Sequence, residues 1–165
     1  FPKNDSFILI DITGEVTDIF FAKSGVLLET SSTPYGKNSV LRDIARSMRT
    51  TPGEALSRLR QDGTNTLTKE ASEKVATALL AAQAKWVSYF ETVLSYVIET
   101  ESIPHVVYVM ADPDLGQTFS TWVTSNVVGQ KKPGTQEYQV TYLTEKMLDE
   151  RVSFKTKKEP KVSDE

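Results

Sequence analysis

Polar residues that could hold a ligand stand where an apolar segment ends near the N-terminus. The segment Phe7–Ile10 is apolar throughout, and Asp11, Thr13, Gly14 and Thr17 follow it closely. An aspartate can position a metal-bound water, while a glycine backbone and threonine hydroxyl groups can contact an anion. Equally, Asp11 could cap nearby backbone N–H groups, and Thr17 could be an ordinary β-branched strand residue. The spacing predicts a polar site at a strand end and leaves both interpretations open.

A second apolar segment, His105–Met110, also ends in acidic residues. Asp112 and Asp114 follow it, with Pro113 between them. Asp112 can cap a helix that has proline in its first turn, and we interpret both acids first as helix-terminal residues. Because ligands of open α/β sheets bind at the carboxyl ends of strands, we expect Asp11 and Asp112 to face one cleft.

Acidic strand ends also suit a metal-dependent phosphodiesterase, in which several carboxylates converge on metal ions. The candidate ligands here are Asp11, Asp18, Asp112 and Asp114. The sequence around them is not basic, so this class ranks behind the others. Since the chain has a single histidine, a histidine metal cluster is excluded.

Composition narrows the functional classes further. At 165 residues the chain fits one domain, which buries roughly 70% of its unfolded surface. With 19 basic and 22 acidic residues it has no general attraction for nucleic acid. The absence of cysteine excludes disulfides, thiolate metal sites and cysteine nucleophiles. Neither a membrane-spanning apolar run nor a signal-peptide pattern is present, and we expect a piece of a longer protein, which could still contact a membrane elsewhere.

Three strands are predicted in the first part of the chain. Val16–Ala22 and Val26–Thr30 are rich in β-forming residues, and Gly25 between them permits a tight turn. Together with Phe7–Ile10 they predict an antiparallel meander. Gln136–Leu143 is predicted as the last strand of the domain.

Helices are predicted between these strands. Apolar residues recur at helical spacing in Ser39–Met48, and Thr51-Pro52-Gly53-Glu54 is a helix start signal for a helix that reaches about Leu59. The longest helix is predicted from about Lys69 to Glu99, and another covers Leu115–Val127. Apolar residues recur along the long helix at alternating intervals of three and four. They could form a coiled-coil seam, but we favour packing of this apolar face against a sheet.

The element order predicts an α/β fold. Three strands, helices, a strand, a helix and a strand give a mixed sheet, in which an antiparallel meander precedes parallel strands and helices cover the sheet. We assign residues 1–153 to this domain and expect the charged tail, residues 154–165, to be disordered.

Several motifs resemble those of the actin-like ATPases, a group that includes actin, sugar kinases and bacterial FtsA and PilM. Asp11–Asp18 (DITGEVTD) resembles their second phosphate motif, an aspartate- and glycine-containing hairpin. Thr33–Ala45 (TPYGKNSVLRDIA) resembles a segment specific to FtsA-type proteins, and Pro52–Arg60 resembles the helix that follows it. Pro104–Gly116 stands where the family has its adenosine motif.

The resemblance implies a ribonuclease H-like fold, corresponding to the second half of an actin-like ATPase domain of FtsA/PilM type. It implies ATP and Mg²⁺ as ligands, with Asp11 as the catalytic and metal-positioning residue. Gly14, Thr17 and Asp112 would then contact the nucleotide. The other half of the same domain would lie upstream of Phe1.

The motifs also depart from the family pattern. Thr13 and Glu15 occupy two glycine positions of the phosphate motif, and Ala111-Asp112-Pro113 replaces the glycines of the adenosine motif. We therefore expect weak or lost ATP binding in a bacterial scaffold of cell division or type IV pilus assembly, whose partners are proteins rather than nucleic acid. The resemblance also implies a cytoplasmic location, which could be at the inner face of the membrane through the parent protein. The alternatives are an active ATPase half-domain and a phosphodiesterase of ribonuclease H-like fold.

Overall fold

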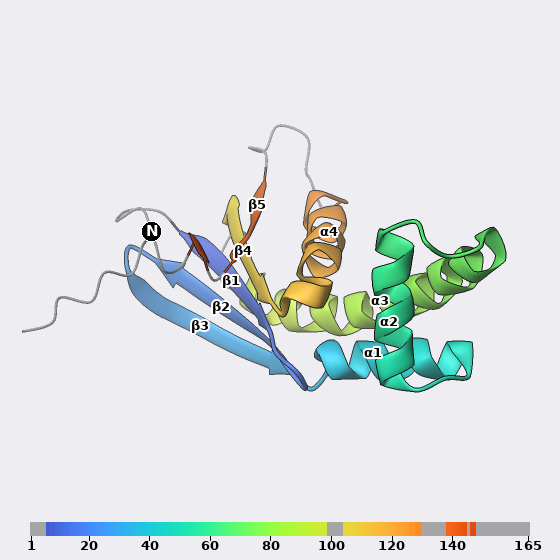
Figure 1. The fold of residues 1–165 in the computed structure, drawn as a ribbon. Helices are drawn as coiled ribbons and strands as arrows, with labels where there is room; N and C mark the ends of the chain where they lie inside the picture. The colour runs from blue at the N-terminus through green and yellow to red at the C-terminus, as the bar shows by residue number, and fades with distance from the viewer. Residues whose placement is uncertain (1–5, 99–103, 130–137, 145, 148–165) are drawn as a thin grey trace, which may run out of the picture.

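A mixed β-sheet forms the centre of the molecule (Figure 1). The computed structural model describes residues 6–98, 104–129, 138–144 and 146–147. Within them the strands are β1 (Phe7–Ile12), β2 (Thr17–Lys23), β3 (Val26–Thr33), β4 (Val106–Ala111) and β5 (Gln139–Tyr142). Their order across the sheet is β3-β2-β1-β4-β5, with β1, β2 and β3 antiparallel and β4 and β5 parallel to β1. This confirms the predicted meander followed by parallel strands.

Side chains alternate between the two faces of each strand, as β-geometry requires. On β1, Ile8, Ile10 and Ile12 are buried on one face, whereas Phe7, Leu9 and Asp11 lie half-buried on the other. The antiparallel register puts Asp11 directly opposite Asp18 of β2. β1 thus presents Asp11 on the face opposite to its buried isoleucine side chains.

Four helices complete the described fold. They are α1 (Lys37–Met48), α2 (Pro52–Gly63), α3 (Lys69–Ile98) and α4 (Pro113–Gly129). The predicted start of α2 is confirmed, because the side chain of Thr51 accepts a hydrogen bond from the Glu54 N–H at 3.3 Å and Pro52 is the first helical residue. The helix continues to Gly63, beyond the predicted end near Leu59.

Aromatic side chains from α3 and α4 form the centre of the core. Trp86 stacks on Phe90 with ring centroids 4.9 Å apart, and its ring lies 5.5 Å from that of Phe119 and 5.9 Å from that of Trp122. All four rings are buried within this chain. The apolar stripe of α3 therefore belongs to the core and not to a coiled-coil seam. Its N-terminal half packs on α1, and its C-terminal half packs on β2 and β3.

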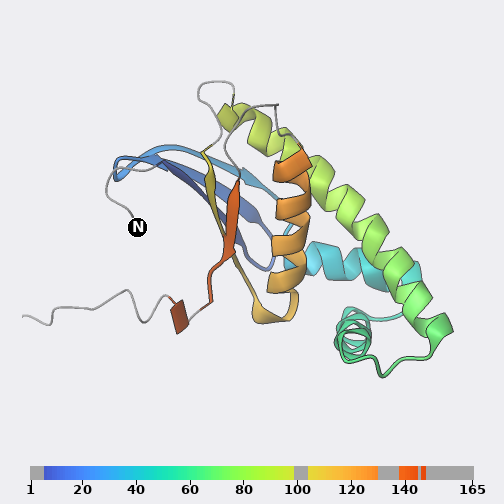
Figure 2. The ribbon, with the colours of Figure 1, turned by 90° about the horizontal axis from the view of Figure 1, so that it is seen from above.

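Both long helices cover the same face of the sheet (Figure 2). The apolar runs of β1 and β4 predict a sheet that is covered on both faces, and the expectation that α3 and α4 would each cover one of them was wrong. The chain crosses from β3 to β4 and from β4 to β5 in the same direction along the sheet. Since parallel crossovers are right-handed, two crossovers in one direction must place their helices on one side.

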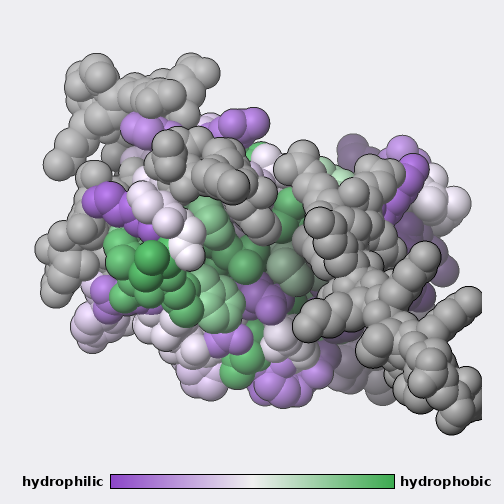
Figure 3. All heavy atoms as spheres, turned by 90° about the vertical axis from the view of Figure 1, so that its left-hand side faces the viewer, coloured by the Kyte–Doolittle hydropathy of each residue, from purple (hydrophilic) through white to green (hydrophobic). Residues whose placement is uncertain are grey.

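The opposite face carries apolar side chains that no helix of the described residues covers. Phe7, Leu9, Phe20, Val106 and Tyr108 are half-buried there. On the edge strand β3, Val26, Leu27 and Leu28 are 58%, 56% and 48% exposed. Figure 3 shows hydrophobic side chains gathered on this side of the molecule. The predicted tail, residues 154–165, and the domain boundary before it lie outside the described residues.

Candidate functional site: a cavity at the carboxyl ends of the parallel strands

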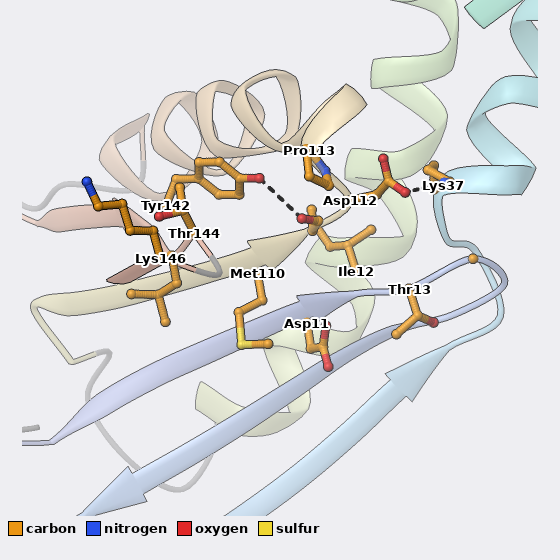
Figure 4. A pocket seen from close by; sticks show the side chains of 13 residues that line it. Asp11, Ile12, Thr13, Lys37, Met110, Asp112, Pro113, Tyr142, Thr144 and Lys146 are labelled. Carbon is orange, nitrogen blue, oxygen red and sulfur yellow. Dashed lines mark hydrogen bonds and ion pairs between the residues drawn. The ribbon is translucent and has the colours of Figure 1, made fainter. Parts of the chain in front are cut away.

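A cavity of about 640 Å³ opens where β1, β4 and β5 end (Figure 4). Its wall includes Asp11 and Gly14 from the end of β1 and the turn after it, and Asp112 from the end of β4. Because β1 and β4 are parallel, their carboxyl ends meet at one edge of the sheet. The structure thus brings together three of the four residues predicted for the site, and the expectation that Asp11 and Asp112 face one cleft is confirmed.

Asp11 is a partly desolvated carboxylate beside a second acid. Burial raises the pKa of Asp11 above its usual value of 3.8, and the charge of Asp18 across the strand pair raises it further. Asp18 in turn accepts a hydrogen bond from the hydroxyl of Ser32. A cation beside Asp11 would relieve both effects, which fits a metal-positioning role. The described residues hold no group of three or more histidines, cysteines or acids that could bind a metal by itself.

The turn after β1 is fixed to the N-terminus of α1 through its carbonyl oxygens. The N–H groups of Gly36, Lys37 and Asn38 donate to the carbonyls of Glu15, Thr13 and Gly14 at 3.1, 2.9 and 2.7 Å. A planar trans peptide holds its N–H opposite to its C=O, so the N–H groups of Gly14 and Glu15 point away from α1. Backbone donors of a turn are the groups that contact phosphate in anion sites.

Gly36 makes this contact between the turn and α1 possible. A Cβ atom at Gly36 would lie 2.6 Å from the backbone N of Val16 and 2.8 Å from the carbonyl carbon of Glu15. These are backbone atoms, which cannot move aside as the end of a side chain can. Glycine is therefore needed here for close approach and not for an unusual backbone angle, since its φ is −103°.

Glu15 points away from the cavity although it occupies a glycine position of the phosphate motif. Arg42 binds it with two hydrogen bonds of 3.2 and 2.8 Å, and the side-chain amide of Asn38 donates a third at 2.9 Å. These donors, Arg42 first, lower the pKa of Glu15 to about 2. The negative charge expected to oppose a phosphate is thus held on the surface of α1.

Asp112 has a structural role and also closes one side of the cavity. Its Oδ1 accepts a hydrogen bond from the Asp114 N–H at 3.0 Å, which confirms the predicted helix cap. Its Oδ2 pairs with Nζ of Lys37 at 2.6 Å. Lys37, followed by the Asp114 N–H, lowers the pKa of Asp112. Asp112 is therefore ionised and already matched by a cation.

The structure does not bring Thr17 to the cavity. Its side chain is fully buried, and its hydroxyl donates to the carbonyl of Tyr35 at 3.0 Å while accepting from Nε1 of Trp86 at 3.2 Å. Thr17 lies on the face of β2 that carries Ile19, beneath α3. Of the two interpretations made from the sequence, the strand residue fits this position and the nucleotide contact does not.

Lys37, Tyr142, Thr144 and Lys146 line the cavity but were missed by the sequence analysis. Lys37 could have been noticed, because it stands within Thr33–Ala45, the segment that resembles FtsA-type proteins. The other three follow or end the last strand, where no motif marks them.

A mixed sheet of this order, with both long helices on one face, is the fold of the actin-like ATPases. Solved structures with this fold include the ethanolamine utilization protein EutJ from Carboxydothermus hydrogenoformans (TM-score 0.56, 18% identity, 82% of this chain and 44% of that chain). The apo ParM protein of pSK41 also shares it (TM-score 0.51, 11% identity, 87% of this chain and 37% of that chain). So does ParM of Bacillus thuringiensis with ADP (TM-score 0.52, 10% identity, 88% of this chain and 43% of that chain). This chain spans less than half of each. No family model and no curated protein sequence matches it.

Proposed function

We propose that this chain is one half of an actin-like protein with a weakened nucleotide cleft, which acts as a scaffold for protein partners. The observation that carries the proposal is the ion pair between Lys37 and Asp112, with Pro113 beside it, at the place where the family resemblance puts adenosine-binding glycines. A ligand base entering there would have to displace a charged pair and pass a proline ring.

The process that the scaffold serves is inferred from the sequence motifs. Thr33–Ala45 resembles a segment of FtsA-type proteins, which supports a bacterial, cytoplasmic role in cell division or type IV pilus assembly. The partners would be proteins of that machinery, together with the other half of the same domain. Among the described residues no helix is both long and apolar enough to cross a membrane.

Calorimetry with Mg·ATP and Mg·ADP tests the weakened cleft. The titrations use the full-length protein as well as this chain, because half of a cleft does not test the whole site. Bacillus thuringiensis ParM, which was solved with ADP, serves as the positive control. We expect no micromolar affinity for either nucleotide, and micromolar binding of Mg·ATP by the full-length protein would contradict the proposal.

An active ATPase half-domain is the second candidate, and the phosphate end of the cavity favours it. The N–H groups of Gly14 and Glu15 are directed away from α1, Glu15 itself is turned aside, and Asp11 lies in the cavity wall. If ATP is turned over, Asp11→Ala should reduce the rate more than Asp112→Ala, because Asp112 acts as a helix cap. Equal losses of turnover at unchanged melting temperature would count against this assignment.

A phosphodiesterase finds no support in the described residues. Asp112 is paired with Lys37, and Asp114 receives three hydrogen bonds from Arg60 at 2.7–2.9 Å. Only Asp11 and Asp18 face each other, so the four candidate acids do not converge.

A further inference from the structure

Gly116 in α4 is explained by the aromatic ring that lies against it. A glycine inside a helix weakens the helix relative to alanine, so its presence calls for a packing reason. A Cβ atom at Gly116 would lie 2.6 Å from Cε2 of Tyr142, and closer still to the tip of the ring. The ring of Tyr142 thus occupies the space that a side chain at position 116 would need.

Tyr142 is held in this place from two directions. It is the last residue of β5 and stands beside Val109 of β4 in the parallel register. Its hydroxyl donates to the carbonyl oxygen of Ala111 at 3.2 Å, as Figure 4 shows. The ring therefore bridges the end of β4 and the first turns of α4, and the cavity opens beside it.

The cavity has two chemically different ends. One end has the turn after β1, whose backbone N–H groups suit an anion. The other end has the aromatic ring of Tyr142, with Pro113 and the ion pair of Lys37 and Asp112 also in the cavity wall. A volume of about 640 Å³ lies within the range of small-molecule sites. A ligand with an anionic group at one end and a flat ring at the other is a nucleotide. In this structure the ring of Tyr142 stands at the end where the flat ring of such a ligand would lie.

We propose that Tyr142 is a gating residue, whose ring fills the position of the ligand's aromatic base and excludes adenine nucleotides until it leaves. The inference rests on the proposed function, since it explains why the cleft is weakened. Tyr142 is half-buried and lines the cavity, so the gate opens when its side chain gives up the hydrogen bond to Ala111 and rotates. The atoms nearest to the missing Cβ of Gly116 belong to the outer part of the Tyr142 ring, which can move without a shift of the helix backbone.

Substitution of Tyr142 in the full-length protein tests the gate. Tyr142→Ala should bind ATP and ADP at least about tenfold more tightly than the wild type, because the base can then occupy the space that the tyrosine ring has left. Tyr142→Phe keeps the ring and should bind like the wild type. Tyr138→Ala is the matched control, since this tyrosine packs partly buried near the same strand but does not line the cavity.

A ligand that replaces the lost ring makes the test independent of nucleotide binding. p-Cresol is the tyrosine side chain without its backbone, so it should raise the melting temperature of Tyr142→Ala but not that of the wild type. It should also compete with ADP for the variant. If Tyr142→Ala does not fold, Tyr142→Leu is measured against the same criteria.

The outcomes separate this inference from the proposed function. Micromolar binding by the wild type contradicts the weakened cleft, whatever the variant does. A folded Tyr142→Ala that binds nucleotides no more tightly than the wild type, or that binds p-cresol and ADP at the same time, overturns the gate. Weaker binding by the variant would make Tyr142 a stacking platform and overturn it as well.

Discussion

At the scale of single residues, two aspartates line one cavity but have opposite electrostatic surroundings. Asp11 is partly desolvated and faces Asp18, so its pKa is raised. Asp112 accepts an N–H of α4 and pairs with Lys37, so its pKa is lowered. Asp11 would therefore gain from a bound cation, whereas Asp112 already has its cation. This difference separates a candidate ligand-binding residue from one with a structural role.

The raised pKa of Asp11 predicts a pH-dependent gain in stability for Asp11→Asn. The folded state disfavours the charged form, so the penalty is absent below the usual pKa of 3.8 and is complete above the raised pKa. Asp11→Asn should therefore melt at a higher temperature than the wild type at neutral pH, and at the same temperature in acid below pH 3.8. Glu91→Gln, at an exposed acid of α3, is the control. A gain that persists unchanged in acid would contradict an electrostatic cause.

For Asp112 the helix cap and the ion pair can be separated by two substitutions. Asp112→Ala removes the acceptor for the Asp114 N–H and should lower the free energy of unfolding by about 1 kcal/mol. Asp112→Asn keeps an acceptor oxygen and only loses charge toward Lys37, so its effect should be much smaller, as is usual for partly exposed ion pairs. Urea unfolding of both variants measures the difference. Equal losses would mean that the ion pair, and not the cap, provides the stability.

At the scale of elements, α1 and the turn after β1 act as one unit. Backbone hydrogen bonds join Gly36, Lys37 and Asn38 to the turn, and the side chain of Arg42 reaches back to Glu15. The otherwise unsatisfied N–H groups at the start of α1 are thereby paired. The cavity wall is positioned by this contact, so changes in α1 should be felt in the turn.

The aromatic core of α3 predicts a large effect for Phe90→Ala. Phe90 is only 1% exposed and stacks on Trp86, so its truncation should reduce the free energy of unfolding by about 3–5 kcal/mol. Circular dichroism and sedimentation measure folding and mass together. Tyr96→Ala, at a residue of the same helix that is 60% exposed, should change stability by no more than about 0.5 kcal/mol. A folded Phe90→Ala monomer derived from a wild-type dimer would contradict the core assignment.

At the scale of the whole molecule, local signals predicted the elements better than the side-chain contacts between distant parts of the chain. The start of α2 rests on Thr51 and Pro52, which act within one turn, and the order of the first three strands follows from their short links. The pair of Lys37 and Asp112 joins residues far apart in sequence, and nothing near either residue indicates its partner. The placement of α3 and α4 on one face could have been predicted from crossover handedness, which the hydrophobic pattern does not contain.

The uncovered face of the sheet leads to a prediction about the chain as a whole. Leu9 and Ile10 are neighbours on β1, but Ile10 is fully buried beneath the helices while Leu9 lies half-buried on the opposite face. Ile10→Ala should lower the free energy of unfolding of this chain by about 2–5 kcal/mol, and Leu9→Ala by clearly less. Chemical denaturation of the two variants, made in the same strand, compares the faces directly.

An equal loss for Leu9→Ala would mean that a part of the chain outside the described residues covers this face. If the loss at Leu9 grows in the full-length protein while that at Ile10 stays constant, the cover is supplied by the rest of that protein, because burial against new apolar neighbours is what makes a truncation more damaging.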